Sequence, residues 1–522
     1  MASGKILTLL IVATLLALAG AWVVARSYRA SMKRLMKTPL PAPSTATGQV
    51  SFAAAPPALA PAIPLTLADN RRAHLRLLLW FIGLTVLMSL LRTVITQLLA
   101  AAPITLKTVA TLGAAYAWPV LPVFAVIGRW SRPRFVGAML GWFVLAVLLL
   151  SWRTNENVSF AMVVKWMLFD TGLPLIVVTA LCLGGATRAV GPWLAPLFML
   201  FAGSSLLGLD LLAALIAGDG PFIHWLAATL NVTLAFALFA LLPWLLAWWP
   251  ARALGRWLAL AYRQRRISEL LYLFTAVWVI ALVGPALGAI GELGWGALVV
   301  FLPLLCIPLG AAAMQRRADP AGARPPTLLA LRVFQQDANV QDIFDRVIER
   351  WRLTGNTVLI AGTDLVDRTI DADDIFTFLD GRLGERFIGN PADVPRRLAD
   401  FEWQRDVDGR YRVNECYCHD TTWQDALAAL VRVSDVVLMD LRNFVAENKG
   451  CLHELQVLAS TPKLARVVVL INDQTQLAPA QAIAASAPAG RFFWLRQQGT
   501  TPLATEQVLA PLFERDRGSA AG

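Results

Sequence analysis

Long apolar stretches recur along the first part of this chain, and they constrain its fold more than any other feature. A helix needs about 20 mainly apolar residues to cross a bilayer. Nine stretches meet that length, at 6–25, 77–101, 108–128, 135–152, 160–186, 191–217, 222–249, 268–290 and 295–314. The sequence therefore predicts a polytopic α-helical membrane bundle of about nine spans. The fifth span is the least regular, because Lys165 and Asp170 interrupt it.

Positive charge flanks these stretches mainly on one side. Basic clusters precede the second span and follow the first, third, seventh and ninth, whereas the other side collects only Lys107 and Arg153. Because Lys and Arg concentrate on the cytoplasmic side of spans, we expect the N-terminus outside and the C-terminal domain in the cytoplasm. This is typical of a multi-pass protein of a bacterial inner membrane. Whether the first span is retained or cleaved stays open, because Ala17-Leu18-Ala19 resembles a signal-peptidase site.

Charge divides the chain into two parts. Residues 1–326 carry 25 Lys+Arg and 8 Asp+Glu, whereas residues 327–522 carry 21 and 27. The basic surplus belongs to the membrane part, so it does not indicate nucleic-acid binding. The expected partners are the lipid bilayer and a second copy of the chain. We expect the following organisation: an anchor span at 1–37, a Pro/Ala-rich linker at 38–70, a multi-span domain at 71–317, and a cytoplasmic α/β domain at 327–515.

Four ionisable side chains fall within the predicted spans, and such residues are functional candidates by default. Lys165 and Asp170 are close enough in sequence to be neighbours on one helix. Arg92 lies near enough to a span end to extend its charge to the interface. Asp210 is expected to pack in an interface with nearby serines. A sensing or anchoring bundle is the simpler interpretation, and a transporter with a regulatory domain is an alternative.

The C-terminal domain alternates short apolar runs with amphipathic segments. This alternation predicts a central parallel sheet covered by helices on both faces, as in flavodoxin-like folds. The expected strands are 329–334, 357–362, 435–440, 466–471 and 491–495, and the expected helices are 340–351, 423–431, 450–460 and 479–485.

Ligands of such sheets bind beyond the carboxyl ends of the strands. Mostly polar residues stand at or directly after the ends of several predicted strands, and they are the expected substrate-binding residues. These are Phe334, Gln335 and Asp337 after the first strand, Thr363 and Asp364 after the second, and Asp440 and Arg442 after the third, with Cys451 opening the next helix.

The join after the third strand carries the strongest pattern, Cys451-Leu452-His453-Glu454-Leu455. On a helix, Cys451 and Leu455 share one face, and Glu454 lies on the flank of that face. A Glu in the first turns is also favoured by the helix dipole. From the spacing alone, both a structural and a functional Glu454 remain open.

A strand with a polar end, a short loop and Cys-x-x-Glu-Leu opening a helix resembles the TIR domain. The resemblance covers about residues 329–496. It implies an NAD⁺ nucleosidase in which Glu454 is the catalytic carboxylate, with NAD⁺ or a related nucleotide as substrate and no cofactor, acting in stress or defence signalling. A carboxylate can stabilise the oxocarbenium-like state of glycosidic cleavage.

The sequence departs from that family in three places. Gly450 stands where the family has Trp, Asp440 stands where it usually has Ser, and 363–420 is a long insertion. The insertion is expected to contain helices at 373–379 and 391–401 and a hairpin at 406–410. The alternative to an enzyme is a membrane signalling or scaffold protein that acts through self-association.

Other chemical motifs are weak. Cys416, Cys418 and His419 resemble a fragment of a metal site, but their spacing is not that of a zinc site and further ligands are lacking. We therefore predict no metal. The chain also has no Gly-x-x-x-x-Gly-Lys-Ser/Thr loop, so a P-loop nucleotidase is not expected.

Overall fold

A computed structural model gives the fold of most of the chain. It describes residues 2–37, 61–153, 159–315, 324–332, 338–361, 372–379, 381–419, 421–499 and 503–514. These form two compact units, each described here by itself. The helical unit comprises Met1–Tyr28, Leu79–Ala313 and Ile370–Phe376, and the sheet unit comprises Arg29–Leu78, Met314–Thr369 and Thr377–Gly522.

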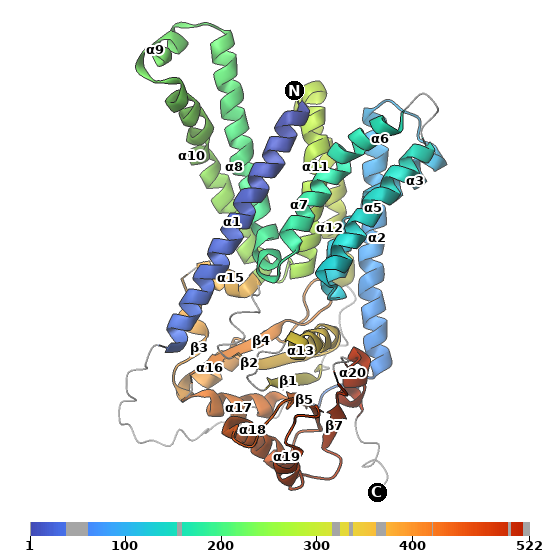
Figure 1. The fold of residues 1–522 in the computed structure, drawn as a ribbon, viewed down its shortest axis with the longest axis vertical. Helices are drawn as coiled ribbons and strands as arrows, with labels where there is room; N and C mark the ends of the chain where they lie inside the picture. Colours follow the sequence, from blue (N-terminus) through green and yellow to red (C-terminus); the bar gives the residue numbers. More distant parts are fainter. Residues whose placement is uncertain are drawn as a thin grey trace. The chain divides into compact units, whose positions relative to one another are not determined.

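The helical unit is built from long apolar helices (Figure 1). Among the described residues, eight helical segments are long and apolar enough to cross a membrane, and a bent pair would make a ninth. The helices, some of which extend beyond this unit, are α1 (Ala2–Lys37), α2 (Leu67–Leu99), α3 (Leu106–Tyr116), α4 (Val120–Ile127), α5 (Arg132–Arg153), α6 (Phe160–Met167), the π-helical η1 (Leu168–Gly172), α7 (Leu173–Cys182), α8 (Gly185–Ala217), α9 (Pro221–Thr229), α10 (Val232–Arg263), α11 (Glu269–Leu293), the 3₁₀-helical η2 (Gly294–Leu305) and α12 (Cys306–Gln315).

The positions of the predicted spans agree with these helices, with three differences in detail. The third span is the bent pair, since α3 and α4 meet at 46°, and Pro119 at the break lacks the N–H that a continuous helix requires. The fifth span is continuous but contains the π-helical turn at Asp170. The seventh begins at Val232 rather than 222, because Asn231 caps a new helix by accepting a hydrogen bond from the Leu234 N–H.

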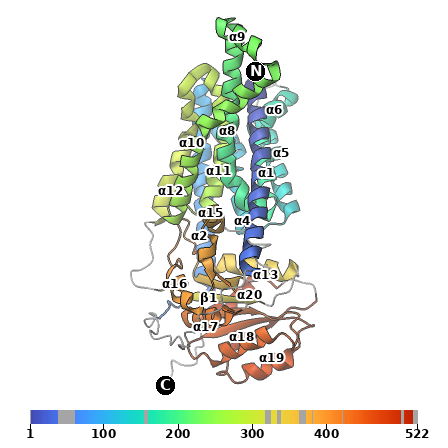
Figure 2. The same ribbon diagram turned by 90° about the vertical axis from the view of Figure 1, so that its left-hand side faces the viewer.

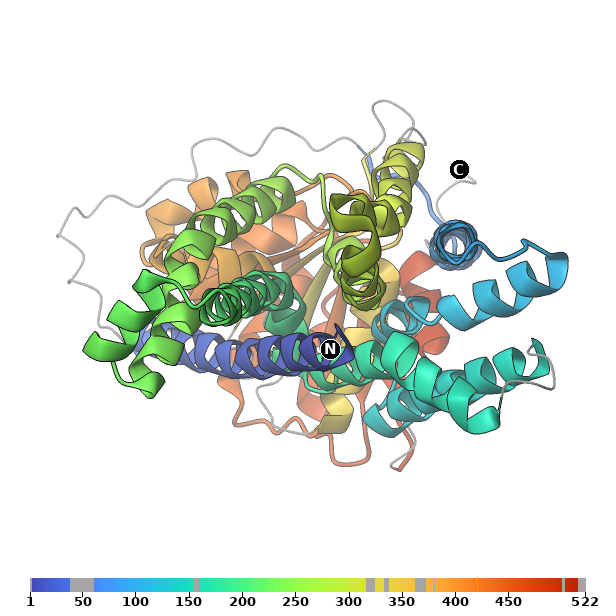
Figure 3. The same cartoon turned by 90° about the horizontal axis from the view of Figure 1, so that it is seen from above.

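Small residues allow close helix packing in this unit. Leu9 and Ala13 of α1 pack with Ala202 of α8, and Figure 3 shows these two helices running side by side. Helices α8 and α10 approach more closely, since a Cβ atom at Gly208 would lie 1.9 Å from the Phe239 carbonyl oxygen. No side chain larger than hydrogen fits there without moving a backbone.

Within the described residues, the sheet unit contains seven parallel strands, so the predicted parallel sheet is confirmed. The strands are β1 (Thr327–Arg332), β2 (Asn356–Ala361), β3 (Phe387–Ile388), β4 (Val413–Cys418), β5 (Val436–Asp440), β6 (Arg466–Ile471) and β7 (Phe492–Arg496). Their order is β3-β4-β2-β1-β5-β6-β7. From β1 the chain places β2 beside it, then β3 at the edge and β4 between β2 and β3, before it returns to place β5 on the other side of β1. The switch point of the sheet therefore lies between β1 and β5.

Helices cover both faces of this sheet. On one face, Leu329, Val437 and Val467 pack with residues of α17 (Trp423–Val433), α18 (Lys449–Ser460) and α19 (Leu477–Ala484). Figure 2 shows α18 and α19 side by side against the sheet. The other face is covered by α13 (Ala338–Trp351) and α20 (Thr505–Phe513), which contact β2, β5 and β6. The predicted helices agree with α13, α17, α18 and α19 to within a few residues.

The expected insertion at 363–420 becomes part of the sheet. Strand β4 pairs with β2 and β3 pairs with β4, so the insertion extends the sheet beyond β2. The described part also contains α15 (Ala372–Leu379) and α16 (Val394–Ala399). The expected hairpin is reduced to a tight turn, with one antiparallel bridge between Arg405 and Tyr411 and Gly409 at a φ of +81°.

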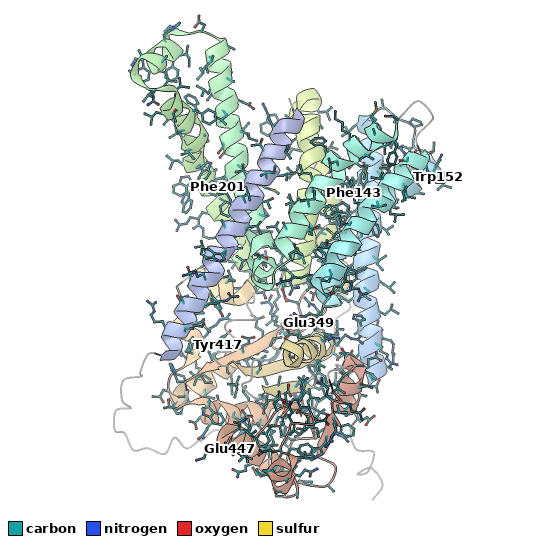
Figure 4. All side chains as sticks on the ribbon, viewed as in Figure 1. Phe143, Trp152, Phe201, Glu349, Tyr417 and Glu447 are labelled. Carbon is teal, nitrogen blue, oxygen red and sulfur yellow. The ribbon has the colours of Figure 1, made fainter. Side chains whose placement is uncertain are left out.

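The first turns of α2 belong to the sheet unit. Asn70 is buried, and its Nδ2 donates to the Arg350 carbonyl oxygen at 2.6 Å and to Thr354 Oγ1 at 3.0 Å. Arg71 forms an exposed ion pair with Glu506 of α20. A second charged group joins α13 to the turn at 406–410: Glu349, labelled in Figure 4, accepts from Arg352 and Arg410.

Candidate functional site

The candidate site is formed by the connection from β5 to α18. Strand β5 lies beside the switch point, and all five of its residues are buried. Helix α18 begins at Lys449, after an eight-residue connection whose Asn448 carbonyl oxygen accepts from the Cys451 N–H at 3.0 Å. A helix that follows a parallel strand starts at the carboxyl edge of the sheet, which is the edge where such sheets bind ligands.

Asp440 and Arg442, both predicted to bind substrate, are bound to each other. Arg442 Nε donates to Asp440 Oδ1 at 2.9 Å, and Nη2 donates to Oδ2 at 2.7 Å. Arg442 Nη1 donates to Gln497 Oε1 at 2.6 Å. Both side chains of the ion pair are buried. Their polar groups therefore stabilise the edge of the sheet, and a substrate would have to displace these bonds to reach them.

A second polar cluster holds the next part of the same loop. Asn443 has a φ of +60°, a left-handed conformation that Asn tolerates better than most residues. Its N–H donates to Asn472 Oδ1 at 3.0 Å, and Asn472 Nδ2 donates back to Asn443 Oδ1 at 2.7 Å. Thr475 Oγ1 donates to the Leu441 carbonyl oxygen at 2.9 Å. These bonds fix the path of the chain into α18.

Among the described carboxylates at this edge, Glu454 is distinct because it is buried without a hydrogen-bond partner. Its side chain lies in the second turn of α18, and the residue is 7% exposed. Its Oε2 atom has no hydrogen-bond partner. Burial raises the pKa of Glu454 to about 8, and no other cause contributes. The carboxyl is thus held ready to change protonation near neutral pH, a property that marks candidate catalytic groups.

Cys451 lies one turn before Glu454 and belongs to the apolar core. It packs with Leu455 and Leu458 beneath the sheet, as the helical spacing predicts. Burial, together with the nearby Glu454 charge, raises the pKa of the Cys451 thiol to about 12. Cys451 is therefore a neutral packing residue, and its contribution to a site is to shape the apolar wall beside Glu454.

The remaining predicted site residues lie outside the described residues. These are Phe334, Gln335 and Asp337 after β1, and Thr363 and Asp364 after β2. Gln497 was not predicted from the sequence, although it directly follows the last strand. The polar residues after each strand were the right signal, and extending that rule to β7 identifies it.

The weak metal motif is not assembled into a site. Cys416 is buried in the middle of β4, and the centroid of the His419 ring lies 5.8 Å from that of Phe387, with the rings tilted by 44°. Among the described residues, no three His, Cys, Asp or Glu side chains are grouped so that they could hold a metal ion. Burial raises the pKa of the Cys416 thiol to about 12, so the thiol stays protonated.

No protein-family model matches this chain, and no curated protein or solved structure matches it either. The fold and the site together define its class: a bundle of apolar helices of membrane-spanning length, joined to a parallel α/β unit. Within that unit, a partner-free carboxyl follows the strand at the switch point.

Proposed function

We propose that this chain is a multi-pass protein of a bacterial inner membrane whose α/β unit is a cytoplasmic, TIR-like hydrolase. Its substrate would be NAD⁺ or a related nucleotide, cleaved at the N-glycosidic bond, and Glu454 would be the catalytic carboxylate. The observation that carries the proposal is the burial of Glu454 with a free Oε2 atom beside the switch-point strand.

The sheet order supports a flavodoxin-like arrangement. Without the two strands of the insertion, the order β2-β1-β5-β6-β7 corresponds to the 2-1-3-4-5 order of that fold, whose ligand binds at the switch point. The Cys451-x-x-Glu454-Leu455 motif occupies the helix that leaves this point. The motif and the topology thus both support a ligand site at this position.

The chemistry requires an ionised carboxylate near the ribose. The bond between C1′ and the nicotinamide nitrogen breaks, its electron pair neutralises the pyridinium ring, and C1′ becomes oxocarbenium-like. Glu454 stabilises that cation before water adds to C1′ and releases a proton. The pKa of about 8 leaves Glu454 partly ionised at neutral pH, and a cationic substrate nearby favours the charged form.

Asp440 and Arg442 act here as positioning residues. Arg442 donates hydrogen bonds to Asp440 and to Gln497. These bonds hold the loop between β5 and α18. We propose that the substrate contacts come from the segments that follow β1 and β2, together with Glu454.

The membrane placement rests on length and charge. The eight apolar helical segments are consistent with a multi-pass protein, and the basic clusters near their ends favour a cytoplasmic sheet unit. In the cytoplasm the unit would have access to nicotinamide nucleotides.

The test is nicotinamide release from NAD⁺ by the purified full chain in lipid nanodiscs. We expect Glu454→Gln, which keeps the size of the side chain and removes its charge, to lower the rate at least 100-fold. The matched control is Glu447→Gln, an exposed glutamate in the loop before α18, which should leave the rate unchanged. Figure 4 labels this residue. Absence of release by the wild-type chain, even when clustered on vesicles, would contradict the proposal.

A non-enzymatic scaffold that works through self-association is the second candidate. Strand β7 is the last strand at its edge of the sheet among the described residues, and Phe493 on it is 37% exposed. Such an edge can pair with a strand of a second copy. This function predicts that Phe493→Lys abolishes cross-linking between full-length chains while Glu454→Gln leaves it intact.

A further inference from the structure

We propose that the helical unit contains a buried site that binds a small monovalent anion together with one proton, built on Arg92 and Asp170. Arg92 of α2 is 2% exposed, and its Nη2 atom lies 3.1 Å from each carboxylate oxygen of Asp170. The expectation that Arg92 extends to an interface is therefore wrong, because its side chain is buried and pairs with Asp170.

The guanidinium is held from several directions. The Tyr116 ring of α3 lies under it, with the Arg92 Cζ atom 3.8 Å from the ring centroid. Thr171 Oγ1 donates to Asp170 Oδ2 at 3.1 Å. The Arg92 side chain is thus fixed in place by an ion pair on one side and an aromatic face on another.

Hydrogen-bond donors remain open at this site. The Nε and Nη1 atoms of Arg92 are buried and have no acceptor, although a guanidinium carries N–H groups on all three nitrogens. On α2, Ser89 Oγ is buried without a partner one turn before Arg92. A guanidinium only donates hydrogen bonds, so the group missing beside Arg92 Nε and Nη1 is an acceptor.

Two irregular helices meet at this pair. Asp170 lies in the π-helical turn Leu168–Gly172, and Tyr116 is the last residue of α3 before the 46° break. π-Helical turns occur frequently at functional sites, and broken helices in membrane bundles surround ligands. An ion pair that served packing alone would not require either irregularity.

The charge balance identifies the ligand class. Arg92 and Asp170 are together neutral, and an unpaired charge in an apolar interior is costly. An anion that accepts from Arg92 would leave one excess negative charge. A proton on Asp170 removes this excess and releases the Asp170 oxygens from Nη2. The anion and the proton therefore bind together. Their combined charge is zero, as is that of an undissociated weak acid.

The other titratable groups near Asp170 do not compete for this proton. Helices α6, α7 and α11 pack against its turn. Helix α6 carries Lys165, which is exposed. The titratable residues of α7 and α11 are Cys182, Glu269, Tyr272 and Glu292. On α5, Arg153 lies 3.5 Å from Thr108 of α3. In the described part of the chain, Asp170 is the carboxylate paired with Arg92, and it is the group to which we assign the proton.

The test uses the full chain in nanodiscs with two probes, sodium acetate and sodium chloride, against sodium gluconate. Calorimetry measures binding, and a pH indicator in weak buffer measures proton uptake. We expect about one proton taken up per anion bound, and binding that weakens as the pH rises. Binding of acetate alone would identify a carboxylate ligand, and binding of both would identify small anions in general.

Three variants separate this site from a structural ion pair. Asp170→Asn leaves a permanent positive charge, so the anion should bind without proton uptake and without pH dependence. Arg92→Gln should abolish binding. The double variant Arg92→Gln/Asp170→Asn keeps the site neutral and should fold but not bind. If the wild-type chain binds neither anion at tens of millimolar, or binds without taking up protons, the site holds water only and the proposal is wrong. Because this measurement is made on the wild-type chain, it tests the proposal even if a variant fails to fold.

Discussion

Arg442 neutralises Asp440 two residues before it, donating to both carboxylate oxygens from a fully buried position. Removing one partner of such a pair leaves an uncompensated buried charge, which typically costs about 3–5 kcal/mol. We predict that Arg442→Ala destabilises the sheet unit by about that amount, measured by urea unfolding of the full chain in detergent.

The control for Arg442 is Arg496→Ala. Arg496 forms an exposed pair with Asp473 at 3.6 Å, and exposed pairs contribute about 0–1 kcal/mol. A loss at Arg442 no larger than the loss at Arg496 would show that the buried pair is not important for stability.

Glu454 makes the stability of the sheet unit depend on pH. Its pKa is about 8 when folded against an ordinary value of 4.5, so the folded state holds its proton more tightly than the unfolded state. Below pH 4.5 the carboxyl is protonated in both states, so it does not lower the free energy of unfolding. Stability then falls as pH rises, and it levels off above pH 8 at a loss on the order of 5 kcal/mol. Glu454→Gln should remove this decline, as measured by unfolding at pH 5, 7 and 9. Parallel curves for wild type and variant would contradict the prediction.

Catalysis by ionised Glu454 has the opposite pH dependence. If nicotinamide release requires the carboxylate, kcat/KM should rise with pH and reach a plateau above about pH 8, the pKa of the free protein. A profile that falls through pH 8 would assign Glu454 as a general acid instead. Steady-state rates at low NAD⁺ between pH 5 and 9.5 decide between the two.

Asn70 is predicted to stabilise the sheet unit although it precedes that unit's first strand by more than 250 residues. The buried side-chain amide of Asn70 forms hydrogen bonds with Arg350 and Thr354. Asn70→Ala leaves these groups without partners, at a cost of about 1–3 kcal/mol. Arg71→Ala on the same helix removes only the exposed pair with Glu506 and should cost under about 1 kcal/mol. Limited proteolysis of the sheet unit would detect the difference, and equal effects would refute it.

Gly208 is predicted to be essential for the close packing of α8 and α10. A Cβ atom there would lie 1.9 Å from the Phe239 carbonyl oxygen, whereas at Gly203 it would lie 3.9 Å from the nearest side-chain atom. Gly208→Ala should lower the melting temperature in detergent, with a cost above the usual 1–3 kcal/mol of overpacking. Gly203→Ala should leave it unchanged. Tolerance of alanine at both positions would show that the helices separate easily.

The sequence was sufficient where structure depends on local composition. Each membrane-length helix is apolar by its own residues, and each central strand is a short apolar run, so both kinds of element could be predicted directly. The sequence was insufficient where structure depends on which surfaces meet. Arg92 and Asp170 lie 78 residues apart, and their pairing depends on how their helices are rotated. Nothing local reveals that rotation.

The same limit applies at the candidate site. Asp440, Arg442 and Glu454 were identified by their positions after a strand and in a helix. That the first two bind each other and the third has no partner follows from tertiary packing. Strand β4 was missed because Asn414 and Glu415 break its apolar pattern, and its pairing with β2 supplies what its own residues do not.

The place of Asn70 in the sheet unit has a consequence for biosynthesis. A ribosome makes Asn70 long before it makes Arg350, and nearly all of the apolar helices emerge in between. The segment of the sheet unit that carries Asn70 is made before the bundle. It can form its contacts in the sheet unit only after the C-terminal residues have been synthesised. A fragment starting at β1 would lack Asn70 and also Arg324, the partner of Asp435. Expression of the C-terminal region in isolation would therefore give a unit with buried polar groups unpaired.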